Sequence, residues 1–126
     1  MRYLKILVIS HFIWFSGAQI STLELLDGVR YKVKDYNIKL KVIICKSSDN
    51  IIALKPSLMH IEYYEVPCQT IMGYPILEVH EVQKLIEWTD VVWITDVEYL
   101  VASRVNRLRR VPVVTHLHSY ALICPW

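Results

Sequence analysis

Apolar and polar residues follow one another in blocks along this chain, and the spacing within each block predicts an element. Short runs of consecutive β-branched and other apolar residues indicate strands that are buried on both faces of a parallel sheet. Apolar residues that recur every three or four positions indicate helices that pack one face on such a sheet. Such runs predict strands over residues 5–9, 90–96 and 113–118, and over residues 38–45, whose first half alternates apolar residues with lysine. Residues 60–66 are expected to form an outer strand that Pro67 ends.

Three helices are predicted between these strands. The first begins at Gly17 and Ala18 after a loop over residues 11–16, and Lys32, Lys34 and Asn37 indicate its end. Its apolar face consists of residues at three-residue steps, namely Ile20, Leu23, Leu26 and Val29. The other two helices are expected over residues 76–88 and 97–109, the former after a turn at Gly73-Tyr74-Pro75.

The alternation of strands and helices indicates an α/β fold that resembles a Rossmann fold. We expect a single domain over residues 1–126, with a twisted, mainly parallel sheet and helices on both faces. The most economical strand order is third, second, first, fourth, fifth, which places the carboxyl ends of the first and fourth strands side by side. The residues expected to be almost wholly buried are Ile6, Leu7, Val8, Val42, Ile43, Ile44, Val92, Ile94, Val113 and Val114.

Composition and charge narrow the function classes. Of the 126 residues, 54% are hydrophobic and 21% are charged, as in a well-packed globule, and a net charge of +2 is too small to imply a nucleic-acid partner. Three cysteines with no CxxC pair indicate reduced thiols in a cytoplasmic protein. Arg2 and Lys5 before an apolar run also fit a secretory signal peptide, but His11 interrupts that run.

The strand order predicts a ligand site at the carboxyl edge of the sheet. Small residues at Gly17 and Ala18 would let a ligand approach the amides at the start of the first helix, where the helix dipole favours an anion. His11, Asp96 and His118 would face the same crevice. The alternative for the first loop is a tight turn between strand and helix that binds no ligand.

Several chemistries are open to the polar residues near the end of the chain. His116 and His118 share a strand face but lack an identifiable third metal ligand, so no metal site is expected. Cys124 could act as a nucleophile with His118, although no residue that would orient the pair is evident. A Ser-His-Asp site would need a nucleophile elbow, which the sequence lacks. A histidine at a strand end that acts on a bound ligand remains.

The most specific pattern is Val113-Val114-Thr115-His116-Leu117-His118-Ser119-Tyr120, followed by Cys124-Pro125. It resembles the segment Val-Val-x-Thr-Leu-His-Asp-Tyr-x-x-x-Cys-Pro in the amino-terminal domain of family 4 glycosyltransferases, which have the GT-B architecture. Ser16-Gly17-Ala18-Gln19 is similar to the Gly-Gly-Ala-Glu loop of that family, and Asp90-Val91-Val92-Trp93 is similar to its Asp-Val-Val-His. Ser16, Ser119 and Trp93 depart from the family pattern.

The resemblance implies the acceptor-side half of a retaining glycosyltransferase, which moves a sugar from a nucleotide-sugar donor to an acceptor without a metal or another cofactor. By position, His118 would be the catalytic residue, and Gly17 with Ala18 would approach the donor diphosphate. The predicted substrate-binding residues are Gly17, Ala18, His11, Asp96, Ser119 and Tyr120. The donor-binding carboxyl-terminal domain would be absent, so we expect this chain alone to be inactive. The sequence specifies neither the sugar nor the acceptor nor the linkage.

A further expectation concerns a partner surface. Arg104, Arg107, Arg109 and Arg110 lie near the end of the third predicted helix, where they form either a solvated helix terminus or a contact with an anionic surface at the inner face of the membrane.

The alternative function is a small flavodoxin-like binding or regulatory module without catalysis. Such a module would bury Tyr120, Leu122, Ile123 and Trp126 in its own core, whereas half an enzyme would leave them exposed.

Overall fold

A computed structural model gives the fold of the chain. The structure describes residues 2–10, 17–46, 61–67, 69–71, 74–76, 78–95 and 101–116. His11, Asp96, His118, Ser119 and Tyr120 lie outside these ranges, as do the apolar residues after Tyr120.

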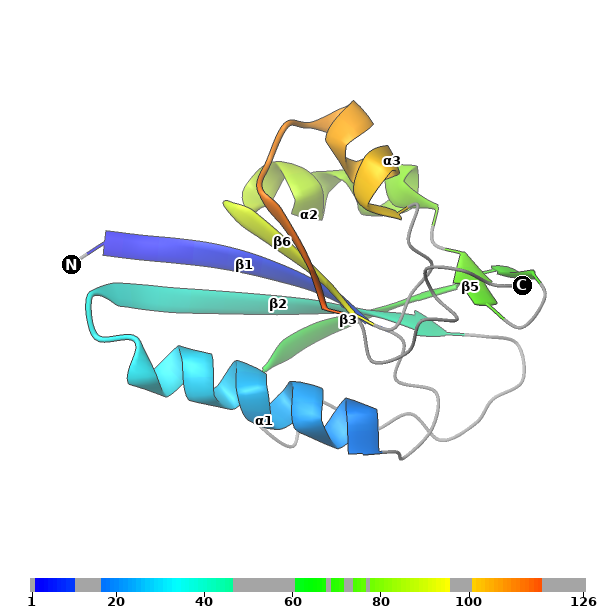
Figure 1. Ribbon diagram of the computed structural model, residues 1–126. Helices are drawn as coiled ribbons and strands as arrows, with labels where there is room; N and C mark the ends of the chain where they lie inside the picture. Colours follow the sequence, from blue (N-terminus) through cyan, green and yellow to red (C-terminus); the bar gives the residue numbers. More distant parts are fainter. Residues whose placement is uncertain are drawn as a thin grey trace.

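Five parallel strands form one twisted sheet, which confirms the predicted fold class (Figure 1). The order is β3-β2-β1-β6-β7, which is the predicted order of third, second, first, fourth and fifth strand. β1 lies between its parallel neighbours β2 and β6, with Val8 opposite both Val42 and Trp93. The strands are β1 (Arg2–Ser10), β2 (Tyr36–Lys46), β3 (Glu62–Pro67), β6 (Val91–Thr95) and β7 (Val113–His116).

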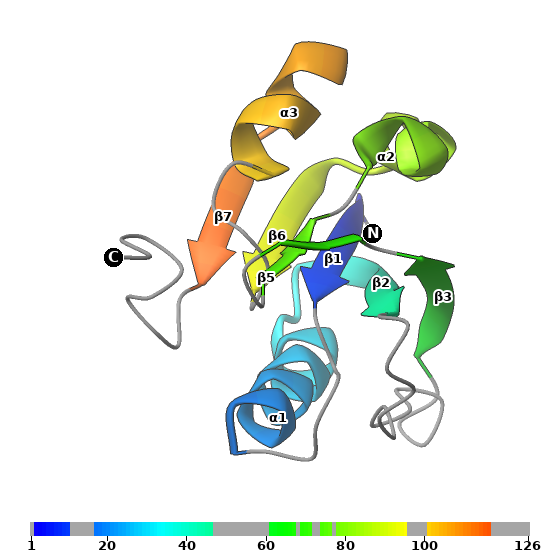
Figure 2. The same cartoon turned by 90° about the vertical axis from the view of Figure 1, so that its right-hand side faces the viewer.

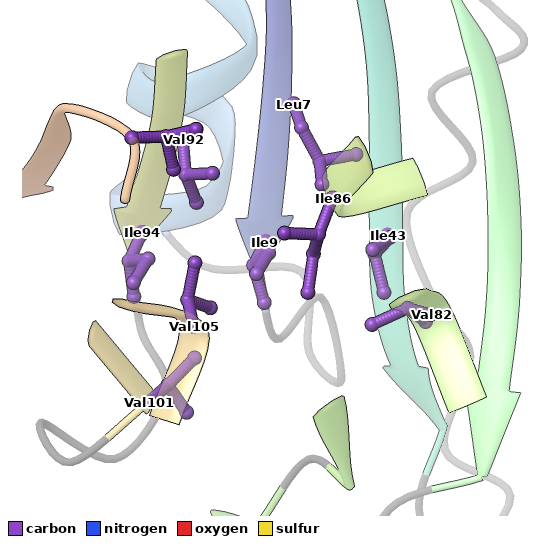
Figure 3. Packing of buried hydrophobic residues seen from close by; sticks show 10 residues of the cluster. Leu7, Ile9, Ile43, Val82, Ile86, Val92, Ile94, Val101 and Val105 are labelled. Carbon is purple, nitrogen blue, oxygen red and sulfur yellow. The ribbon is translucent and has the colours of Figure 1, made fainter. Parts of the chain in front are cut away.

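The central strands are apolar on both sides because each face of the sheet has its own core. Leu7 and Ile9 of β1 pack into one cluster, and Ile6 and Val8 pack into the other. Figure 3 shows the first cluster, in which Ile86 and Val105 come from two helices above the sheet. The continuous run that predicted β1 therefore serves two cores at once.

Helices cover both faces of the sheet, as Figure 2 shows by looking at the tips of the strands. α1 (Gly17–Lys32) lies on one face, where Leu26 is fully buried and Val29 is partly buried in the second cluster. On the other face lie η2 (Val79–Val82), α2 (Gln83–Trp88) and α3 (Val101–Leu108). Val101 and Val105 are the fully buried residues of α3.

The chain before α2 differs from the prediction. β4 (Gln69–Ile71) pairs antiparallel with β5 (Tyr74–Ile76), so Tyr74 and Pro75 lie in a strand rather than in a turn. The predicted helix over residues 76–88 was too long, because Glu78 is extended and its side chain accepts a hydrogen bond from the His80 amide. This cap starts a 3-10 turn at Val79, which α2 continues to Trp88.

The prediction that Val113 and Val114 are buried was wrong. Val113 is only partly buried, and Val114 is 52% exposed, whereas the other eight residues of the predicted core are buried. Within the described sheet β7 is an edge strand, which pairs with β6 alone. Val114 lies opposite Trp93 on the side of α1, but α1 packs mainly beneath β1 and β2, so the described helices leave Val114 uncovered.

Candidate functional site

The candidate site lies at the carboxyl edge of the sheet, where β1 and β6 end side by side. Ile9 lies opposite Ile94 in the register, so the next residues, Ser10 and Thr95, are the last of the two strands. The chain leaves β1 toward β2 and leaves β6 toward β7, on opposite sides of this boundary. Such a switch point is where ligands bind in open α/β sheets.

The first helix begins beside this edge. Gly17 and Ala18 are the first two residues of α1, which begins seven positions beyond the end of β1. The first amides of a helix have no hydrogen-bond partner within the helix, and the positive end of the helix dipole lies at the same terminus. The structure thus places the two residues predicted to approach an anion in the first turn of α1.

Three further side chains share the α1-side face of β6 and β7, and we had not predicted them as a group. Trp93 and Thr95 are two positions apart on β6 and therefore face the same side of the sheet, and Thr95 lies opposite His116. The rings of Trp93 and His116 have centroids 6.1 Å apart and planes tilted by 35°. Thr95 is fully buried, and Trp93 and His116 are partly buried.

Two polar atoms of this group are buried without a hydrogen-bond partner among the described residues. They are the Thr95 hydroxyl oxygen and Nε1 of the Trp93 indole. Buried polar atoms without a partner are uncommon, and a ligand or a water molecule usually provides the missing bond. Thr95 is a hydroxyl residue at the end of an otherwise apolar strand, and this was the signal in the sequence that could have identified it.

The remaining predicted site residues are not placed. His11 and Asp96 come directly after β1 and β6 in the sequence, and His118, Ser119 and Tyr120 come within four residues of the end of β7, but all five lie outside the described residues. Within the described ranges, no group of three His, Cys, Asp or Glu side chains could hold a metal ion.

The arginines near the end of α3 have more than one role. Nη1 of Arg109 donates hydrogen bonds to the carbonyl oxygens of Ile86, Glu87 and Thr89, at 2.9, 2.8 and 2.6 Å. These carbonyls belong to the end of α2, so Arg109 caps that helix. Arg107 and Arg110 are exposed. Of the bunched arginines, these two retain the exposure that a contact with an anionic surface requires.

Comparisons with models of protein families, with curated proteins and with solved structures found no match. Among the helices that the structure describes, none has the length and apolar character to cross a membrane.

Proposed function

We propose that this chain forms the acceptor-side half of a retaining glycosyltransferase, which transfers a sugar from a nucleotide-sugar donor to an acceptor. The observation that carries the proposal is the parallel order β3-β2-β1-β6-β7, in which α1 is the helix that follows β1 and begins at Gly17. This order agrees with the resemblance of the Gly17 loop and of the segment around His118 to family 4 glycosyltransferases.

The strand order also bears on the alternative of a flavodoxin-like module. Flavodoxin-like sheets have the order 2-1-3-4-5, whereas Rossmann sheets begin 3-2-1-4-5. Counting only the strands of the parallel sheet, this chain has the second order. The strand order therefore differs from that of a flavodoxin-like sheet and agrees with the Rossmann-like sheet that the resemblance implies.

In the proposed reaction, the residues of this chain bind and orient rather than form a covalent bond. The amides at Gly17 and Ala18 would bind the donor diphosphate, and the Thr95 hydroxyl and the indole N–H of Trp93 would bind hydroxyl groups at the edge of the sheet. His118 would hydrogen-bond a hydroxyl of the transferred sugar and support charge near the departing phosphate, which is most effective where water is excluded. A donor-binding domain, in the same polypeptide or in a second subunit, would complete the cleft.

The test compares two histidines with the donor-binding domain supplied and the donor saturating. His118→Ala should lower kcat by roughly 10²-fold or more and leave the melting temperature almost unchanged. His116→Ala should lower the melting temperature and change kcat little, because the His116 ring packs beside Trp93. Equal activity of the two variants would leave His118 without a catalytic role.

A further inference from the structure

At the amino-terminal end of the sheet, opposite the candidate site, part of β2 has a neighbouring strand on one side only among the described residues. β2 pairs with β1 from Tyr36 onward, but its register with β3 begins only at Lys41, which lies opposite Glu62. Among the described residues, the stretch of β2 from Tyr36 to Leu40 therefore has a partner on one side only. Figure 1 shows β1 and β2 continuing past the start of β3. The backbone N–H and C=O groups on the open side can accept another strand.

A cavity of about 450 Å³ lies at this open edge. Ile38 and Leu40, which belong to the core on the α1 side, line it together with Lys39 and Lys41, whose side chains are on the α2 side. Because residues from both faces of one strand line the same cavity, the cavity follows the edge of β2 rather than either face. Arg30 of α1 and Trp88 of α2 flank it from the two helix layers.

The lysines of this edge are held on aromatic rings. Nζ of Lys39 lies 4.9 Å from the ring centroid of Tyr3, and Nζ of Lys41 lies 4.3 Å from that of Trp88. Within the described part of the chain neither ammonium group has an ion pair. The rings hold the two charges in place and leave them without a carboxylate.

Like charges are gathered here at a cost in stability. Lys5 lies directly opposite Lys39 on the neighbouring strand, and opposed like charges destabilise a sheet. Glu62 lies opposite Lys41, but its carboxylate accepts a hydrogen bond from the Tyr64 hydroxyl, and this bond raises the pKa of Tyr64. Among the described residues that line the cavity, three are cations, Arg30, Lys39 and Lys41, and one is an anion, Glu62, so this edge attracts an anionic group from outside the described chain.

The position of the helices favours a peptide over a phosphate. The carboxyl ends of α1 and α2, at Lys32 and Trp88, lie toward this edge, so neither of these two described helices offers its N-terminus to a phosphate here. The open edge instead offers main-chain groups over five residues, from Tyr36 to Leu40, which at about 3.3 Å per residue is roughly 16 Å.

We propose that this edge binds an extended acidic peptide segment of a partner protein, which adds a strand beside β2. Alternate side chains of such a strand face opposite sides of the sheet, so an acidic residue would meet Lys39, and apolar residues would meet Ile38 and Leu40. The lysines would also exclude basic strands from the edge. This site is independent of the proposed sugar transfer, because it lies at the other end of the sheet.

The experiment measures binding of a fluorescently labelled octapeptide of alternating Glu and Val to the full chain by anisotropy. We expect a Kd on the order of 10–100 μM at low salt. Lys39→Glu should weaken binding at least tenfold, whereas Arg107→Glu, which reverses an equally exposed charge on α3, should change it less than twofold. Circular dichroism should show that both variants fold, since both side chains are exposed.

Two further probes separate strand pairing from charge attraction. A peptide that is N-methylated at alternate amides should lose binding, because its backbone cannot pair with β2, and a peptide of alternating Lys and Val should not bind. The proposal is overturned if no binding occurs up to about 1 mM, if the N-methylated peptide binds equally well, or if Lys39→Glu has no effect. Tighter binding of an oligothymidylate that Lys39→Glu weakens would identify a nucleic-acid site instead.

Discussion

At the scale of single residues, Thr89 joins three parts of the structure. Its side chain is fully buried, and its hydroxyl lies 2.9 Å from the Lys5 carbonyl oxygen and 2.7 Å from that of Val91. The Thr89 carbonyl oxygen accepts a hydrogen bond from Arg109. The neighbouring Asp90 amide donates to the Lys5 carbonyl, and the Asp90 carboxylate accepts from the Lys5 amide. This turn therefore holds the start of β6 against β1.

Replacing Thr89 by valine tests this role. Thr89→Val keeps the shape of the side chain but removes its hydrogen bond at a buried position, so the free energy of unfolding should fall by about 1–2 kcal/mol. Thr115→Val is the matched control, because Thr115 is exposed on β7, and it should change stability by less than about 0.5 kcal/mol. Urea denaturation of both variants measures the difference. Equal stabilities would show that the Thr89 hydroxyl contributes nothing.

At the scale of elements, α2 is only six residues long and depends on a side chain from outside it. Three carbonyl oxygens at its end accept hydrogen bonds from Arg109, which follows α3. A guanidinium at the carboxyl end of a helix also interacts favourably with the dipole. Arg109 thereby ties α2 to the end of α3 on the same face of the sheet.

Removing this cap should therefore destabilise the protein. Arg109→Ala should lower the free energy of unfolding by about 2–3 kcal/mol, since charged hydrogen bonds to partly buried carbonyls are lost. Arg110→Ala removes the neighbouring, exposed arginine and should change stability by less than about 0.5 kcal/mol. Thermal and urea unfolding compare the two variants. A loss for Arg110→Ala as large as that for Arg109→Ala would contradict the capping role.

The elements themselves differ in how well the sequence predicted them. The apolar runs over residues 6–9 and 42–45 predicted the parallel strands, because strands buried on both faces require apolar residues at consecutive positions. The β4–β5 pair was missed because short apolar segments around Pro75 do not distinguish a strand from the start of a helix. Arg109 was placed in a surface cluster because spacing along one helix says nothing about the carbonyls of another.

At the scale of the whole molecule, position within the sheet decides how much each valine contributes. Val8 lies on the central strand and is fully buried, whereas Val114 lies on β7 and is 52% exposed. Val8→Ala should lower the free energy of unfolding by roughly 1–3 kcal/mol through lost burial and a residual cavity. Val114→Ala should lower it by less than about 0.5 kcal/mol. Equal losses in urea unfolding would contradict the observed placement of β7.

The two edges of the sheet present different chemistry. The carboxyl edge has a helix N-terminus at Gly17 and the buried hydroxyl of Thr95, and the amino edge has lysines beside an open strand. The position of the carboxyl edge could be predicted, because the alternation of strands and helices along the chain predicts the strand order of the sheet. The placement of Thr95 opposite His116 and the open edge of β2 could not be predicted, because both depend on the register between strands.

The most direct test of the transferase proposal is an NMR titration of the ¹⁵N-labelled chain with UDP-glucose. One helix terminus contributes about 1 kcal/mol or less toward an anion, so binding by this chain should be millimolar or weaker. The amide shifts should change most at Ser10, Gly17, Ala18 and Thr95 and remain constant at Lys39. Tight binding, or shift changes confined to the amino edge, would contradict the assignment of the carboxyl edge as the acceptor-side half of a transferase site.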